Sequence, residues 1–249
     1  MSEEYAMNTT LHLIWGPTST GKTAKSVALA ERNGAPVLVL DRIQCCPDVA
    51  IGSGRPSEQE LRGTKRVYLN SRPIAQGIIS AQQAVERLHQ LIDHYSAIYP
   101  LIILEGGSVS ILQEMVKHRT WGQQYAWSFE PVPMPSTEHF LKRATQRVWE
   151  MFYPGDGLKS LLDEMVQIWA YPEYRYTLAD IDGYRCIISY MHQRRRHVDE
   201  ILHMSLDEHK QLAEEIAREY WQHALWQQEN FPAIPHTWCQ PPRRLTQSD

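Results

Sequence analysis

Residues 11–23 read LHLIWGPTSTGKT, and this stretch decides the fold that the sequence predicts. A short, mostly apolar run (Leu11–Trp15) is followed by the pattern G-x-x-x-x-G-K-T, which starts at Gly16 and ends at Thr23. A buried strand that leads into such a turn and then into a helix is the context in which this pattern binds phosphate. Backbone N–H groups of the turn point at the anion, and the dipole of the following helix favours negative charge. The sequence therefore predicts a phosphate-binding loop after a buried strand.

We expect six residues of this loop to hold a diphosphate: Gly16, Ser19, Thr20, Gly21, Lys22 and Thr23. Lys22 supplies a full positive charge, and the hydroxyl of Thr23 can contact Mg²⁺, which is the expected cofactor. A glycine-rich turn without a ligand is the alternative. Phosphate binding is favoured because it explains every fixed position of the motif.

Apolar runs that fit buried strands recur along the first half of the chain: Leu11–Trp15, Val37–Leu40 and Leu101–Leu104, with weaker candidates at Lys65–Leu69 and Tyr125–Phe129. Between them, apolar residues at helical spacing predict an amphipathic helix after Ser80. Ser57 and Glu60 fit a capping box, which predicts another short helix. Strands that alternate with helices favour a parallel sheet covered on both faces. We therefore predict an α/β fold of the P-loop type, with helices flanking the sheet and a C-terminal helical part.

The pattern changes after three prolines, Pro131, Pro133 and Pro135. From about Ser136 onward the sequence is helical, with helices expected at 140–152, 158–169, 183–194 and 205–228. The last residues are rich in proline and polar side chains, which is typical of a loose tail. We divide the chain into an N-terminal extension (1–10), an α/β core (11–135), a helical part that completes the substrate site (136–231) and a flexible tail (232–249).

Composition narrows the possible partners of the chain. Its 249 residues carry 25 Lys and Arg against 29 Asp and Glu, a formal charge of -4. Firm binding of nucleic acid needs a basic face, so we expect small anionic substrates and no nucleic acid. The four cysteines form no CxxC pair, which predicts reduced thiols in the cytoplasm. The polar N-terminus and the lack of long apolar runs predict neither a signal peptide nor a membrane span. A monomer is the default expectation.

Asp41 is the first candidate for chemistry outside the loop. P-loop nucleotide hydrolases usually hold Mg²⁺ with an Asp at the end of a second strand, whereas the matching run here ends in Glu105. Asp41 instead follows the strand after the first helix, at the edge where α/β sheets bind ligands. An acid there can act on a second substrate, but position alone favours a turn-forming or capping acid equally.

Longer segments carry a resemblance to a known family. They are Leu38–Pro47, which includes Asp41-Arg42 and Cys45-Cys46-Pro47; Gly52–Pro56; Gly16–Thr18; Leu104–Ser108; Asp182–Arg185; and Glu219, Tyr220 and His223. Together they closely resemble the bacterial adenylate isopentenyltransferases, the cytokinin synthases, from about Leu11 to Phe231. The related tRNA dimethylallyltransferases share the loop and the aspartate, but they typically have Asp-Ser at this point and an inserted tRNA-binding part.

The resemblance implies a prenyltransferase that moves a dimethylallyl or 4-hydroxy-3-methylbut-2-enyl group from its diphosphate to N6 of AMP. Diphosphate is released, and the product is a cytokinin nucleotide; ADP or ATP are other possible acceptors. Two alternatives stay open at this point. The first is a tRNA adenosine dimethylallyltransferase, and the second is a P-loop kinase that acts on a small molecule.

The resemblance also implies roles for individual residues. Adenine N6 is a weak nucleophile because its lone pair is delocalised, and Asp41 is similar to the family's general base. Thr18 matches a residue that hydrogen-bonds the diphosphate near its reacting oxygen, and Lys22 stabilises the charge that develops there. Arg147 matches a diphosphate clamp, with Lys142 as a plausible helper. The alternative for these two cations is a solvated helix face.

The acceptor and the prenyl tail have their own candidates. By resemblance, Ser53 and Tyr220 contact the nucleotide, and Asp182 binds the amino edge of adenine. His223 and Asp182 match residues near the prenyl tail, where they could hydrogen-bond the terminal hydroxyl of a hydroxylated donor. Without the resemblance, Asp182 fits a turn carboxylate, and Tyr220 with His223 fits a packed helix face.

Overall fold

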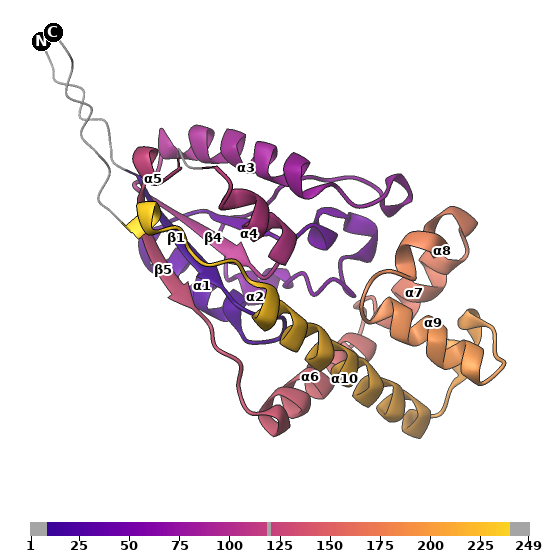
Figure 1. The fold of residues 1–249 in the computed structure, drawn as a ribbon. Helices are drawn as coiled ribbons and strands as arrows, with labels where there is room; N and C mark the ends of the chain where they lie inside the picture. The colour runs from indigo at the N-terminus through magenta and orange to yellow at the C-terminus, as the bar shows by residue number, and fades with distance from the viewer. Residues whose placement is uncertain (1–8, 119–120, 240–249) are drawn as a thin grey trace, which may run out of the picture.

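The computed structural model describes residues 9–118 and 121–239, and its centre is a parallel sheet of five strands (Figure 1). The strand order is β3-β2-β4-β1-β5. The strands are β1 (Thr10–Trp15), β2 (Val37–Leu40), β3 (Arg66–Tyr68), β4 (Leu101–Gly106) and β5 (Ala126–Pro131). In the register, β4 pairs with β1 on one side and with β2 on the other. The carboxyl ends of β1 and β2, which lead into the phosphate loop and into Asp41, therefore flank the end of β4.

Successive side chains along a strand point to opposite faces of the sheet. Both faces of this sheet are apolar, and helices cover each of them. Leu13 and Leu104 belong to an apolar cluster with α3 and α4, whereas Ile14 and Ile103 pack on the α1 side. The helices around the sheet are α1 (Lys22–Asn33), α2 (Glu58–Leu61), α3 (Ala81–Ser96), α4 (Val109–Met115) and α5 (Trp121–Gln124), with 3-10 turns η1 (Ile43–Cys45), η2 (Pro47–Val49) and η3 (Ile74–Gln76). The predicted capping box at Ser57 begins α2, and the helix predicted after Ser80 is α3, which also begins with a full capping box. The predicted fold class is confirmed.

The second half of the chain is helical. Its elements are α6 (Thr137–Phe152), α7 (Leu161–Trp169), α8 (Pro172–Leu178), α9 (Tyr184–Gln193), η4 (Val198–His203) and α10 (Leu206–Asn230). We did not predict α8, which begins at a proline that suits the first position of a helix. The apolar core of this half also contains Cys46, Val49 and Ile74. The loops after β2 and β3 thus pack against the helical part.

The predicted flexible tail is wrong for residues 232–239. The chain returns from α10 to the sheet and ends its described course in η5 (His236–Cys239), beside β5 and α5 (Figure 1). Trp238 is 1% exposed and stacks on Trp127, with ring centroids 4.3 Å apart. Proline and polar composition suggested a loose segment, but one buried indole removes enough apolar surface from water to fix it. Residues 240–249 lie outside the described residues.

The N-terminal extension ends before its predicted limit at residue 10. Thr10 already belongs to β1, and the hydroxyl of buried Thr9 donates to the carbonyls of Ser96 and Tyr99, both at 3.1 Å. Residues 1–8 lie outside the described residues. Across residues 9–118 and 121–239, every helix is too short or too polar to cross a membrane.

Candidate active site

A cavity of about 970 Å³ lies where the carboxyl ends of the strands face the helical part. It brings together most of the predicted site residues: Thr18, Ser19, Gly21, Lys22, Thr23, Asp41, Ser53, Lys142, Arg147, Asp182, Tyr220 and His223. Gly16 and Thr20 belong to the loop but do not line the cavity. A Cβ at Gly16 would lie 2.4 Å from the carbonyl oxygen of Val132, and the Thr20 hydroxyl donates to the Pro17 carbonyl at 2.8 Å. These two residues therefore hold the shape of the loop and do not contact the cavity.

The phosphate loop is shaped by unusual backbone angles at two positions. Ser19 and Gly21 have φ values of 58° and 93°, in the left-handed region that favours glycine. Lys22 then opens α1 and folds back, so that its Nζ donates to the Pro17 carbonyl at 2.6 Å. Burial lowers the pKa of Lys22, whereas the nearby carboxylates of Glu105 and Asp41 oppose this shift. The ammonium therefore lies in a site where an incoming anion would stabilise its charge.

Asp41 acts as a local cap and also faces the cavity. Its Oδ1 accepts hydrogen bonds from the backbone N–H groups of Ile43 at 2.8 Å and Gln44 at 3.1 Å. No donor among the described residues contacts Oδ2. Burial raises the pKa of Asp41, while the two backbone donors and Lys22 oppose the shift. One oxygen of this acid thus shapes the turn, as the capping interpretation expects, and the other contacts no donor among the described residues.

Glu105 occupies the position where related nucleotide hydrolases have a metal-binding aspartate. Its Oε2 lies 2.6 Å from Nη1 of Arg66, and both side chains are almost fully buried, at 5% and 2% exposure. Sequence reasoning missed this partner, because an arginine at the start of a short strand gives no signal of its own. The carboxylate is therefore engaged by an internal cation beneath the phosphate loop.

The donor groups of the site fit a magnesium ion bound mainly through a ligand. Within the part of the chain that the structure describes, no cluster of three His, Cys, Asp or Glu could hold a metal by itself. Thr23 lines the cavity at the start of α1. Mg²⁺ commonly uses few protein ligands, several waters and the phosphates of a substrate. Thr23 matches that pattern.

Helix α6 brings three cations to the cavity wall: Lys142, Arg143 and Arg147. Arg147 pairs with Glu60 of α2, with Nη1 and Oε1 2.9 Å apart. Arg143 lies nearest to the loop, because a Cβ on Gly21 would be 3.2 Å from its Nη2. A diphosphate can therefore meet Arg143 directly, whereas it must compete with Glu60 for Arg147.

Another part of the cavity wall is built from side chains of α10 and the turn before α9. His223 Nδ1 lies 2.9 Å from Asp182 Oδ2, and Arg185 contacts the other oxygen of the same carboxylate. Burial alone would raise the pKa of Asp182, but His223 and Arg185 outweigh it, so the pKa is lowered. Asp182 is thus held as a charged acceptor, directly beside the imidazole.

The nucleotide candidates come from α10 and from the loop after η2. Tyr220 is one turn before His223 on α10, and its hydroxyl would be 2.7 Å from a Cβ placed on Gly183. Ser53 lines the cavity, and its carbonyl accepts a bond from Gln44 Nε2 at 3.1 Å. Sequence reasoning missed two buried polar residues. Gln227 contacts the phosphate loop, and Glu164 contacts the loop just before Ser53. Neither belongs to a recognisable motif.

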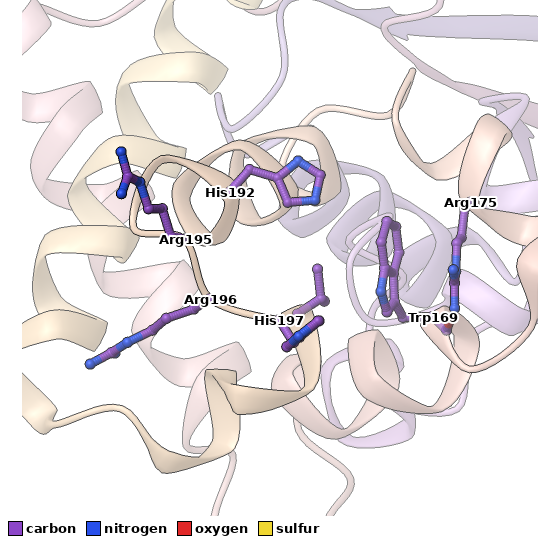
Figure 2. Close-up of a pocket in the computed structure, with 7 residues that line it drawn as sticks. Trp169, Arg175, His192, Arg195, Arg196 and His197 are labelled. Carbon is purple, nitrogen blue, oxygen red and sulfur yellow. The ribbon is translucent and has the colours of Figure 1, made fainter.

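A second cavity of about 410 Å³ shares no lining residue with the first (Figure 2). Trp169 and Arg175 form one wall, with the guanidinium carbon 4.9 Å from the ring centroid. Arg195 and Arg196 point away from this pair in Figure 2, and Arg196 is bonded to Glu208 at 2.8 Å. The basic cluster of residues 194–197 is therefore spread over separate local contacts.

Comparisons with known proteins give matches over most of the chain. Residues 9–242 match the sequence profile of the family described as isopentenyl transferase. A relative from Ralstonia nicotianae, named adenylate dimethylallyltransferase, is 44% identical over 228 residues, which is 92% of this chain and 96% of the relative. A protein of the same name from Agrobacterium fabrum is 44% identical over 225 residues, or 90% and 92% of the two chains.

Solved structures show a similar fold. The tRNA delta(2)-isopentenylpyrophosphate transferase of Staphylococcus epidermidis superposes with a TM-score of 0.62 at 14% identity, covering 91% of this chain and 92% of that one. The full-length tRNA isopentenylpyrophosphate transferase of Bacillus halodurans gives a TM-score of 0.61 at 16% identity, covering 87% and 86%. At such low identity, these likenesses concern the fold alone.

Proposed function

The chain belongs to the isopentenyl transferase family, and from this premise we propose that it transfers a dimethylallyl group from its diphosphate to N6 of AMP. One observation carries the proposal: the same cavity is lined by residues of the predicted phosphate loop and by the half-buried acid Asp41. A phosphate loop suits a departing diphosphate, and an acid suits a nucleophile that must lose a proton. The names of the relatives supply the prenyl donor and the adenylate acceptor.

The proposed reaction begins with both substrates in the cavity. The donor diphosphate lies on the loop amides and Lys22, with Thr18 near the oxygen that bonds the allylic carbon. The bond between this oxygen and carbon breaks, and its electron pair leaves with the diphosphate. Lys22, Arg143 and Arg147 stabilise the charge that develops there. Mg²⁺, held by Thr23 and by the phosphates, would add positive charge at the same place.

Asp41 completes the reaction on the acceptor side. The N6 lone pair forms the new bond to the allylic carbon, and Asp41 takes the proton that N6 loses. The lowered pKa of Lys22 and the raised pKa of Asp41 fit groups whose charges depend on each other and on bound substrate. Ser53, Asp182 and Tyr220 would orient the nucleotide, and the product would be a cytokinin nucleotide.

We further propose that the hydroxylated donor is accepted. His223 and Asp182 form a polar pair on the wall of the same cavity, and a terminal hydroxyl could hydrogen-bond to either. The expected setting is a monomer in the cytoplasm. Free thiols at Cys45 and Cys46, both buried, are consistent with a reducing compartment.

The test is a direct assay with purified protein, Mg²⁺, dimethylallyl diphosphate and AMP, followed by mass spectrometry of the nucleotide. We expect AMP with one added prenyl group and release of diphosphate. Parallel reactions use an anticodon stem-loop RNA, and ATP with small alcohols. Prenylation of the RNA but not of AMP would show a tRNA enzyme, and phosphoryl transfer from ATP would show a kinase; either result refutes the proposal.

A further inference from the structure

We infer that two buried polar residues of the helical part, Gln227 and Glu164, are positioning residues, each for one substrate. Gln227 holds the phosphate loop for the donor, and Glu164 holds the loop around Ser53 for the acceptor. The ligand identities rest on the proposed function, but the contacts themselves do not. Neither residue has to touch a substrate, since each acts through the backbone of another segment.

Gln227 links the phosphate loop to the turn after β4. Gln227 is only 5% exposed, and its Oε1 accepts a hydrogen bond from the backbone N–H of Thr18 at 2.7 Å. Its Nε2 donates to the carbonyl of Gly107, also at 2.7 Å. The two segments pack closely here, because a Cβ on Gly107 would lie 2.7 Å from the Gly16 carbonyl oxygen. One amide therefore satisfies a donor on one segment and an acceptor on the other.

This link should matter for the donor in particular. Thr18 is the residue proposed to contact the reacting oxygen of the diphosphate, so the direction of its side chain depends on the backbone that Gln227 holds. Gln227 also lies one helical turn after His223 on α10. A loss of the amide would leave a buried N–H without its partner and loosen the loop, and displacements well under 1 Å reduce binding and rate.

Glu164 performs the corresponding task for the acceptor loop. Its residue is 2% exposed, and its oxygens accept from the backbone N–H groups of Ile51 at 3.0 Å and Gly52 at 2.9 Å, and from the hydroxyl of Tyr184. Gly52 packs directly on Tyr184, since a Cβ there would lie 2.2 Å from the hydroxyl oxygen. Ser53, the proposed nucleotide contact, is the next residue.

The chemistry of this contact requires a carboxylate. Three donors converge on Glu164, and an ionised carboxylate is a pure acceptor with room for all of them. Among the described residues, no cation forms an ion pair with it. Burial raises the pKa of Glu164, and the three donors, together with the charge of Lys159, oppose this shift. A glutamine has nearly the same shape, but its NH₂ group would face one of the backbone N–H donors. Glu164→Gln should therefore displace the loop without leaving a cavity.

Calorimetric binding separates the two roles without relying on turnover. Inorganic diphosphate with Mg²⁺ probes the donor loop, and AMP added to protein saturated with diphosphate probes the acceptor loop. We expect Gln227→Ala to weaken diphosphate binding about tenfold, the loss typical of one hydrogen bond, here the bond that holds the phosphate loop. AMP binding should be unchanged. Glu164→Gln should give the reverse: about tenfold weaker AMP binding, with diphosphate binding unchanged.

Exposed neighbours provide matched controls. Gln228→Ala changes the same residue type one position along α10, and Glu173→Gln makes the same substitution on the exposed helix α8. If Gln227→Ala fails to fold, Gln227→Met keeps the volume without the hydrogen bonds, and Tyr184→Phe is the milder change at the Glu164 contact. Equal losses for both ligands in both variants, or no loss beyond the controls, would overturn the inference.

The result also separates this inference from the proposed function. A selective loss for each ligand in a protein that makes no prenylated AMP would uphold the positioning roles and reject the reaction. Normal prenylation of AMP by the wild type, with binding that the two variants leave unchanged, would uphold the reaction and reject the positioning roles.

Discussion

The two ends of the cavity are built in different ways. The proposed diphosphate end is built mainly from one short stretch of chain, of which Thr18, Ser19 and Gly21–Thr23 line the cavity, with cations of α6 beside it. The other end joins Asp182, which precedes α9, to His223 on α10, and this contact depends on how the two helices pack. The first end can be recognised from a short motif, whereas the second exists only in the folded chain.

Asp41→Asn is the substitution with the largest expected effect, because it disables the step that both ends prepare. The amide can still accept the backbone bonds from Ile43 and Gln44, so the turn should persist. Without a base, turnover should fall by about 10² to 10⁴-fold. Steady-state assays measure the rate, and calorimetry with inorganic diphosphate should show nearly unchanged binding. A rate close to that of the wild type would remove Asp41 from its proposed role.

Lys22→Met tests the diphosphate end by itself. The variant keeps a long side chain but loses the charge that faces the departing diphosphate, so turnover should fall by about 10² to 10³-fold. Weaker binding of inorganic diphosphate should accompany the loss, while AMP binding should stay close to that of the wild type. If AMP binding falls as far as diphosphate binding, the two ends are not independent.

His223→Leu tests the far end. Leucine replaces the polar imidazole with an apolar side chain, so kcat/KM for the dimethylallyl donor should be nearly unchanged. The hydroxylated donor should lose about tenfold in kcat/KM, the equivalent of one hydrogen bond. Parallel kinetics with both donors measure the ratio. Equal losses for both donors would show that His223 supports the site without selecting between them.

The smallest expected effect concerns pH. Burial raises the pKa of Asp41 above the ordinary 3.8 of an aspartate, and a base must be deprotonated to act. As the pH falls, a larger fraction of Asp41 is therefore protonated than in an exposed aspartate. The acid limb of kcat/KM for AMP, which reports the free enzyme, should accordingly lie above pH 3.8. A profile that stays flat down to that pH would contradict the assignment.

The difference between the two ends also explains what the sequence could predict. Alternating apolar strands and helices predicted the parallel sheet, and Gly16 to Thr23 predicted the phosphate loop, since these signals are local. The partners of the loop were out of reach. Gln227 meets the loop, and Arg66 meets Glu105 beside it, only after the sheet has formed and α10 has crossed back to the core.

Composition led to a wrong prediction for the segment after α10, because one buried side chain fixes it. The segment after Pro232 is rich in proline and polar residues, yet the indole of Trp238 fixes residues up to Cys239 against Trp127 and Trp121. The roles of Asp182 and Tyr220 came from resemblance, because an Asp-Gly pair and a tyrosine on a helix indicate little by themselves. Their shared cavity is a product of tertiary packing.

Helix α10 has a consequence for the size of the donor. It runs without interruption from Leu206 to Asn230, so the separation between His223 and Gln227 is set by the helical rise, at roughly 6 Å along the axis. If the prenyl tail points toward His223 while the diphosphate lies on the loop that Gln227 holds, this helix works as a molecular ruler. A five-carbon prenyl chain matches this separation, whereas a ten-carbon chain would have to displace residues of the cavity wall.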